Sequence, residues 1–242
     1  MLIINADDWG RSVEETDAAF RCYKAGRITS VSAMVFMEDS QRAADLANEH
    51  NLEVGLHLNL TEGFTAKTAS LLERYQERIT HFLRSTKYSL LLYNPFLQKE
   101  ISYSYHAQAA EFERLFGRAP SHLDGHHHMH LCANLLFSNT IPAGTRMRRN
   151  FSFWSGEKSW LNRTYRGLVD RRLQRRYRVP DHLFDLTQSV LEKKIARVIE
   201  LAKSSKVELM THPVIPTESE YLMSDQFRGM LERLDTASYA LV

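Results

Sequence analysis

The sequence is poor in cysteine: Cys22 and Cys132 are the only two in 242 residues, and they fit no CxxC pattern. This scarcity argues against a disulfide framework and favours a reducing compartment, so we expect a cytoplasmic protein. Long apolar runs are also missing, since no window approaches the roughly 18 apolar residues of a membrane span. Asp7 and Asp8 come too early to leave room for a secretory signal, and we expect none.

An excess of charge of one sign is missing as well. The formal net charge is +2, and the charged fraction of 25% is ordinary for a globular protein. Because no recognition motif is visible either, we expect no nucleic-acid partner. Internal repeats, low-complexity segments and Pro/Gly/Ser-rich linkers are absent, which favours one domain over residues 1–242 with a substantial buried core.

What the chain does contain is an alternation of short apolar runs and longer amphipathic stretches, the pattern of repeated β–α units. We expect strands at 2–6, 30–36, 53–60, 121–126, 145–149, 182–186 and 207–212. We expect helices at 12–26, 39–50, 67–86, 97–116, 158–177, 188–204 and 225–235. The first helix has the clearest boundaries, with an S-x-x-E capping box from Ser12 to Glu15 and a stop at Gly26.

The expected strand over 53–60, EVGLHLNL, indicates the architecture. Its leucines and valine share one face, whereas Gly55, His57 and Asn59 point the other way. In an open sheet with helices on both sides, both faces should be apolar. The polar face therefore favours an α/β fold of the TIM-like (β/α) barrel type, regular or distorted, with its active groups at the carboxyl ends of the strands.

Acidic and histidine residues gather at these strand ends: Asp7, Asp8, His57, His126 and His212. The stretch DGHHHMH (124–130) alone holds four of the eleven histidines. Helix capping would explain the acidic pair by itself, and a structural hydrogen bond would explain His57 by itself. Several imidazoles on one short segment, however, repel when protonated and rarely help folding, which favours a metal or catalytic role. One Asp and two His ligands suit a divalent ion and leave a coordination position open.

The same motifs carry a resemblance to a known family. NADDWG, TSVSAMVF, GLHLNLTEG, FGRAPSHLDGHHHMH and ELMTHP resemble, in this order, the motifs of the YdjC-like carbohydrate deacetylases. The resemblance extends from Leu2 to Leu234, essentially the whole chain. The family includes chitooligosaccharide and hopanoid-type deacetylases and is similar in mechanism to the NodB-type polysaccharide deacetylases. It implies a distorted TIM-like barrel, which agrees with the strand pattern.

Carried over position by position, the resemblance implies that Asp8, His57 and His126 bind one divalent metal ion, either Mg²⁺ or Zn²⁺, with Mn²⁺, Co²⁺ and Ni²⁺ as alternatives. It also implies that Asp7 is the catalytic base and His212 the general acid. The implied reaction is hydrolysis of the amide of an N-acetylated amino sugar, with release of acetate. The sugar, its chain length and any lipid attachment stay open.

Four further residues are candidates for substrate binding or for support of the ligands. Asp124 and His128 are expected to orient the ligands, because strand alternation puts His128 on the side of His126. Arg148 lies near the end of an expected strand and binds substrate hydroxyls or phosphate, unless it forms a salt bridge or lies on the surface. Asp181 lies in PDHLFD, which resembles a late segment of the family, and is expected at the rim.

Seven arginines lie between 163 and 178. They indicate either a solvated helix face or a surface for an anionic membrane or a phosphorylated lipid carrier, helped by the apolar stretch SLLLYNPF at 89–96. The oligomeric state is open, with a homodimer as one option. Two rival functions also stay open: another metal-dependent hydrolase or a sugar isomerase on a similar barrel, and a non-catalytic protein that binds carbohydrate or metal.

Overall fold

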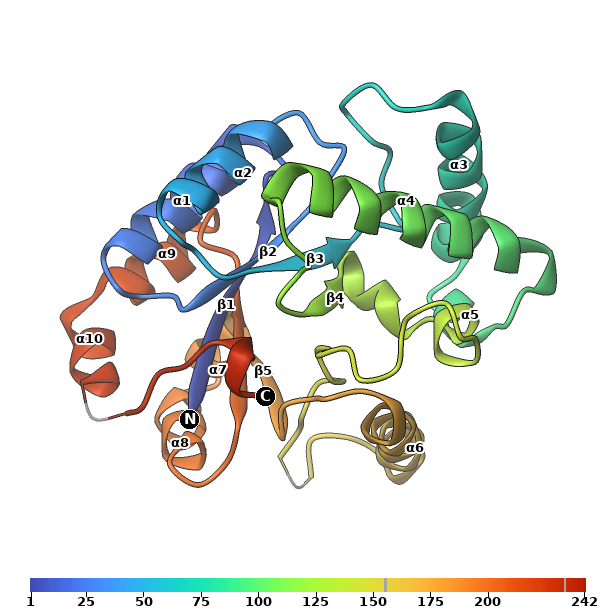
Figure 1. Cartoon of the computed structure of the whole chain (residues 1–242). Coiled ribbons are helices and arrows are strands. Elements are labelled where there is room, and N and C mark those ends of the chain that lie inside the picture. The colour runs from blue at the N-terminus through green and yellow to red at the C-terminus, as the bar shows by residue number, and fades with distance from the viewer. Residues whose placement is uncertain (155, 233) are drawn as a thin grey trace.

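The computed structural model describes residues 1–154, 156–232 and 234–242. Six strands form one parallel sheet surrounded by helices (Figure 1). The strands are β1 Leu2–Trp9, β2 Ser30–Ala33, β3 Val54–Leu58, β4 Leu123–Gly125, β5 His182–Asp185 and β6 Val207–Thr211. The helices are α1 Val13–Lys24, α2 Ser40–Glu49, α3 Ser70–Ser85, α4 Gln98–Phe116, α5 Ala133–Leu136, α6 Trp160–Arg176, α7 Leu186–Leu191, α8 Ile195–Ala202, α9 Pro216–Met223 and α10 Asp225–Leu231. Four 3-10 helices add η1 Ser89–Leu91, η2 Pro95–Leu97, η3 His126–Leu131 and η4 Tyr239–Leu241.

The sheet has the strand order β4-β3-β2-β1-β6-β5. It curls so strongly that β3 and β1 run in very different directions in Figure 1. The irregular segment 145–152 lies between the two edges of the sheet. Its Arg148 N–H donates to the carbonyl of Leu123 in β4 (3.0 Å), and its Ser152 N–H donates to the carbonyl of Leu183 in β5 (2.9 Å). The α/β prediction is therefore confirmed as a curled, six-stranded half-barrel, whereas a full TIM barrel is not.

On β3, one face is apolar and the other carries polar residues, as its sequence predicts. Val54, Leu56 and Leu58 of β3 belong to the apolar core, while His57 between them is buried without joining it. Outside the sheet, α1 packs on β1, α4 packs on β3, and α7 and α8 pack on β6. The apolar residues therefore hold the helices, and the polar ones are free to line the interior. None of the helices in the described ranges combines the length and hydrophobicity that a membrane crossing requires.

Three predictions of secondary structure were wrong. Residues 145–149 form no strand, because β4 has only three residues and Met147 pairs with it at a single position, opposite Leu123. The expected helix over 188–204 is two helices, α7 and α8, separated where Lys193 adopts a φ of 55°. The short helices α5 and α9 were missed, although Pro216 at the first turn of α9 is a recognised start signal.

The last residues of the chain cover the amino-terminal end of the sheet. The Leu2 N–H donates to the carbonyl of Asp235 (3.0 Å), and the Ala237 N–H donates to the carbonyl of Leu2 (2.9 Å). These bonds bring η4 beneath the barrel, where Tyr239 is completely buried. The two chain ends accordingly lie near each other in Figure 1.

Candidate active site

The end of β1 is distorted so that two neighbouring carboxylates serve one site. The pairing with β2 skips from Ala6 to Trp9, so Asp7 and Asp8 together face a single residue of β2. Asp8 has a φ of 64°, in the left-handed region that Asp tolerates better than most side chains. A regular strand would point the two carboxylates to opposite faces. The bulge therefore brings both carboxylates near His57.

Asp8, His57 and His126 converge from three separate strand ends. Asp8 Oδ1 lies 2.9 Å from His126 Nδ1 and 3.2 Å from His57 Nε2. The three residues are buried, and their donor atoms all lie within 4.8 Å of one another. One carboxylate and two imidazoles at this spacing fit a divalent cation with a coordination position left for water or substrate. The expected metal ligands thus lie together.

The pKa values of Asp8 and His57 are set by their charged neighbours. Burial favours a raised pKa for Asp8, but hydrogen bonds from His126 and His57 hold the pKa far below its ordinary value. Burial favours a lowered pKa for His57, but the negative charges of Asp124 and Asp7 raise that pKa to about 10. A metal ion that binds here competes with a proton for the His57 imidazole.

Asp124 fixes the orientation of His57. The two residues face each other across the β3–β4 pair, and His57 Nδ1 lies 2.8 Å from Asp124 Oδ1. The Ser32 hydroxyl donates to the other oxygen, Oδ2, at 2.8 Å. A carboxylate on the far nitrogen of an imidazole fixes its tautomer and leaves Nε2 free to ligate. The geometry agrees with the expected orienting role of Asp124.

Asp7 is held by a buried arginine. Arg148 Nη1 donates to Asp7 Oδ2 at 2.6 Å, and Arg148 Nη2 donates to Asp7 Oδ1 at 2.7 Å. Asn5 Nδ2 donates to Oδ1 as well, at 2.9 Å. Arg148 is 0% exposed, so of the roles that the sequence offered it has the salt bridge rather than direct contact with substrate.

The histidine cluster is a tight turn and not a continuing strand. β4 ends at Gly125, and His127 and His128 both have a positive φ, 52° and 59°. Strand alternation therefore fails here, and placing His128 on the side of His126 was wrong. The ring of His128 packs edge-on against Phe151 at 4.5 Å between centroids, whereas it is His127 whose ring lies 4.0 Å from that of His126.

Sequence reasoning missed Glu62 and Arg11. Glu62 Oε1 lies 3.1 Å from His126 Nε2, the nitrogen that faces away from Asp8. Arg11 forms two hydrogen bonds to the same carboxylate: Nε donates to Oε2 at 3.1 Å, and Nη2 donates to Oε1 at 3.0 Å. The signal was the pair of polar residues, Thr61 and Glu62, directly after the expected strand over 53–60.

His212 follows the last residue of β6 and is half-buried. Its ring lies in a group with Asp185 and Glu218, whose side-chain donor atoms come within 4.8 Å of one another. The Glu218 carboxylate accepts the backbone N–H of His212, which anchors the loop. Pro213 and Val214, which follow His212, line a surface groove together with residues of α1 and α9.

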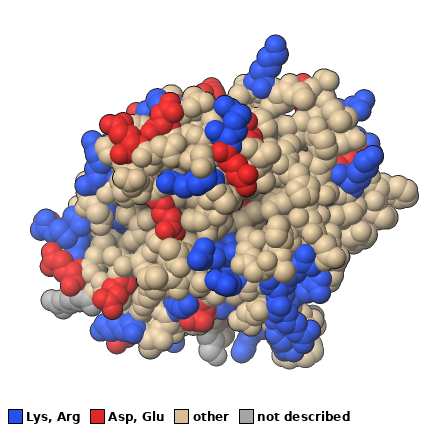
Figure 2. All heavy atoms as spheres, viewed as in Figure 1, with Lys and Arg blue, Asp and Glu red and all other residues tan. Residues whose placement is uncertain are grey.

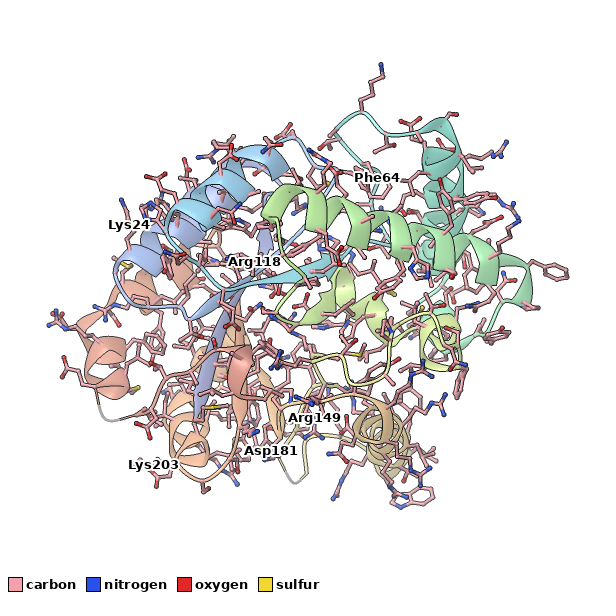
Figure 3. All side chains as sticks on the ribbon, in the orientation of Figure 1. Lys24, Phe64, Arg118, Arg149, Asp181 and Lys203 are labelled. Carbon is pink, nitrogen blue, oxygen red and sulfur yellow. The ribbon has the colours of Figure 1, made fainter. Side chains whose placement is uncertain are left out.

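Asp181 does not reach the site. It precedes β5 and is exposed at the amino-terminal end of the sheet, where its carboxylate accepts the backbone N–H of Lys206 at 2.8 Å. Figure 3 shows it low in the molecule, in the part that also carries Lys203. Because the candidate ligands lie at the carboxyl ends of the strands, the prediction of a rim position for Asp181 was wrong.

The chain is similar to several known proteins. The family model described as YdjC-like protein matches residues 1–233. A carbohydrate deacetylase of Mus musculus is 31% identical over 61% of this chain and 49% of that protein. A chitooligosaccharide deacetylase of Serratia marcescens is 35% identical over 54% of this chain and 51% of that protein. The chain thus spans about half the length of the curated relatives it matches.

Among solved structures, a protein of Enterococcus faecalis has a closely similar fold. The two chains superpose with a TM-score of 0.70 over 98% of this chain and 97% of the other, at 22% identity. That protein is described as a putative cellobiose-phosphate cleavage protein. At this identity the similarity shows the fold, including the half-barrel, and nothing about the reaction.

Proposed function

Because this chain belongs to the YdjC-like family, we propose that it is a metal-dependent hydrolase that removes the N-acetyl group from an amino sugar and releases acetate. The observation that carries the proposal is the convergence of Asp8, His57 and His126 beside a second carboxylate, Asp7, which the arginine of a salt bridge holds in place. Relatives named carbohydrate deacetylase and chitooligosaccharide deacetylase supply the substrate class.

Asp8, His57 and His126 would hold one divalent ion, for which we propose Mg²⁺ or Zn²⁺. When bound, such an ion polarises the amide carbonyl and lowers the pKa of a coordinated water. Asp124 keeps His57 in the ligating tautomer through Nδ1, and Glu62 contacts His126 through Nε2.

Asp7 acts as the base that accepts a proton from the attacking water. A carboxylate has about four lone-pair sites. Oδ1 already accepts from Asn5 and Arg148, whereas Oδ2 accepts from Arg148 alone, so Oδ2 keeps a lone pair for the water. Since the guanidinium occupies the opposite side, the carboxylate cannot rotate to present another atom.

His212 acts as the general acid for the leaving amine. An amine departs poorly unless it is protonated as the C–N bond breaks. The half-buried imidazole of His212 lies within 4.8 Å of the Asp185 carboxylate, at the carboxyl end of β6.

The test is acetate release from N-acetylglucosamine oligomers, with metal content measured on the same sample. We expect acetate in proportion to bound metal, and its loss in Asp8→Ala. The rival enzymes, another metal-dependent hydrolase or a sugar isomerase, predict a different product and no acetate. A non-catalytic binder predicts sugar binding with no product. Either result would sink the deacetylase proposal.

We also propose a contact between α6 and an anionic lipid surface. α6 carries six arginines and one aspartate, and it buries only Val169 and Leu173. Trp160, Leu161 and Leu168 are exposed by 74%, 71% and 57%. Basic side chains gather over this helix in the lower right of Figure 2. Exposed apolar groups among arginines suit an anionic membrane, and like charges oppose pairing of two copies through this face.

The remaining assignments are proposals of the same kind. A cytoplasmic location is supported by two free, buried cysteines, which need no oxidising compartment. A single domain is supported by one continuous sheet that draws strands from both halves of the chain. A homodimer would use a face other than α6.

A further inference from the structure

One guanidinium in the barrel interior is shared by three acids. Besides Asp7, Arg148 contacts Asp124 Oδ2 with Nη2 at 2.8 Å and Glu208 Oε1 with Nε at 2.7 Å. Arg148, Asp124 and Glu208 are each 0% exposed. The guanidinium is planar and its donors have fixed directions. The acid bound along its Nε–Nη2 edge therefore sets the orientation of its Nη1–Nη2 edge.

Glu208 is itself held by a residue of the C-terminal turn. The Tyr239 hydroxyl donates to Glu208 Oε2, the oxygen that Arg148 leaves free. The Tyr239 ring stacks on His122 with 3.7 Å between centroids and 7° between planes. Backbone bonds from Leu2 fix the segment that carries this tyrosine. An unbroken series of contacts therefore joins the C-terminal turn to the carboxylate of Asp7.

We propose that Glu208 and Tyr239 are positioning residues for Asp7. Tyr239 fixes Glu208, and Glu208 fixes the Nε–Nη2 edge of Arg148. The adjacent Nη1–Nη2 edge then holds Asp7 with one lone pair of Oδ2 free. The inference rests on the proposed role of Asp7 as base. It assigns a catalytic contribution to the C-terminal turn, which lies at the end of the barrel opposite the metal ligands.

Kinetic constants distinguish this positioning role from a purely structural role for the cluster. Small displacements of a reacting group lower the rate of a step sharply while leaving substrate binding intact. A residue that acts through Asp7 must therefore change kcat and leave KM and metal affinity alone. A residue that only stabilises the barrel changes the amount of folded protein and none of these constants.

The first experiment compares Tyr239→Phe, Glu208→Gln and Glu208→Met in acetate release from N-acetylglucosamine oligomers. Tyr239→Phe keeps the ring on His122 and removes one hydrogen bond, so we expect kcat to fall about fivefold with KM and the Kd for Zn²⁺ unchanged. Glu208→Gln keeps an acceptor for Arg148 and should stay within about twofold, whereas Glu208→Met removes it and should lose more than about tenfold. Tyr105→Phe, at another buried tyrosine, is the matched control and should behave as the unchanged protein.

The second experiment repeats Tyr239→Phe in an Asp7→Asn background. If Tyr239 acts through Asp7, its removal has no further effect there, because the group that it positions is gone. The same fivefold loss in both backgrounds, or full kcat in Tyr239→Phe or Glu208→Met, would overturn the inference. Full activity of Asp7→Asn alone would instead overturn the proposed base.

A measurement that needs no turnover tests the same inference if the change in kcat is small. The NMR resonance of the Arg148 Nε–H, assigned by its loss in Arg148→Lys, should shift in Tyr239→Phe and not in Tyr105→Phe. An unmoved resonance means that Tyr239 does not position Arg148, and the inference fails.

Discussion

Arginine has opposite roles in two regions of this molecule. Arg148 is completely buried and lies within 2.8 Å of three carboxylates, from β1, β4 and β6. Arg171 and Arg175 of α6, by contrast, are exposed on a helix with a single acid. Charges interact far more strongly in a poorly polarisable interior than in water. The same side chain therefore fixes a site in one region and leaves an unneutralised surface in the other.

Replacing Arg148 should break the fold as well as the site. Arg148→Met leaves three buried carboxylates without their cation, and losing one partner of a buried ion pair costs about 3–5 kcal/mol. Arg171→Met, on the exposed helix, should change stability by less than about 0.5 kcal/mol. The check is the free energy of unfolding from denaturant titration. Equal effects of the two variants would remove the distinction between the regions.

Asp7→Asn keeps the shape of the site and removes the proposed base. We expect acetate release to fall about a thousandfold, the usual contribution of a general base, while bound metal stays at its original level because Asp8, His57 and His126 remain. The measurement is kcat together with metal content by mass spectrometry. Asp45→Asn, at an exposed position on α2, is the control and should keep full activity. Survival of turnover in Asp7→Asn would contradict the assignment.

Glu208 should make the stability of the interior depend on pH. Burial raises its pKa from 4.5 to about 7, so the folded state holds the proton more tightly than the unfolded state does. Below pH 4.5 this proton adds about 3 kcal/mol to the free energy of unfolding, and the contribution is lost as pH rises to about 7.

Glu208→Gln has no such proton and should remove this part of the pH dependence. Denaturant midpoints of the original protein and of Glu208→Gln, measured from pH 4 to pH 8, should differ by an amount that changes with pH. Glu200→Gln, at an exposed acid of α8, should leave the curve as it was. Parallel curves for the original protein and Glu208→Gln would mean that the buried acid does not titrate.

The smallest effect on fold and turnover is expected on α6. Arg171→Glu with Arg175→Glu should leave stability and acetate release unchanged. It should weaken sedimentation with vesicles of phosphatidylcholine and phosphatidylglycerol by more than about tenfold, because each basic residue near an anionic surface contributes about 1 kcal/mol.

The matched control for α6 is Arg74→Glu with Arg84→Glu on α3, where both arginines are also exposed. Equal loss in the two pairs would indicate a general charge effect and not a lipid-binding face. A change in molecular mass by light scattering in the α6 pair alone would indicate a second copy of the chain as the partner.

The sequence predicted that Asp8, His57 and His126 lie together, whereas it predicted part of the sheet wrongly. Asp8, His57 and His126 could be chosen because residue type and position at a strand end are local properties of the chain. The failure at His128 has a physical cause: alternation holds only while a strand continues, and two left-handed residues ended it after Gly125. The segment 145–149 failed for a related reason, since a strand needs partners and its neighbour is three residues long.

Contacts between distant parts of the chain could not be predicted from the sequence. Nothing local to Arg148 distinguishes it from Arg146 or Arg149, and its acids lie up to 141 residues away. Glu62 and Tyr239 likewise gain their roles from the curl of the sheet and the return of the C-terminal segment. Such assignments depend on tertiary packing, which periodicity and residue type do not encode one position at a time.

The bulge at the end of β1 has a consequence for how the two carboxylates work together. Asp7 and Asp8 are consecutive, so one almost inextensible peptide unit fixes the distance between their Cα atoms. If Asp8 holds the metal and Asp7 is the base, as proposed, a shift of the Asp8 backbone toward a larger ion would also move the backbone of Asp7. A change of metal would then reach the step that removes the proton.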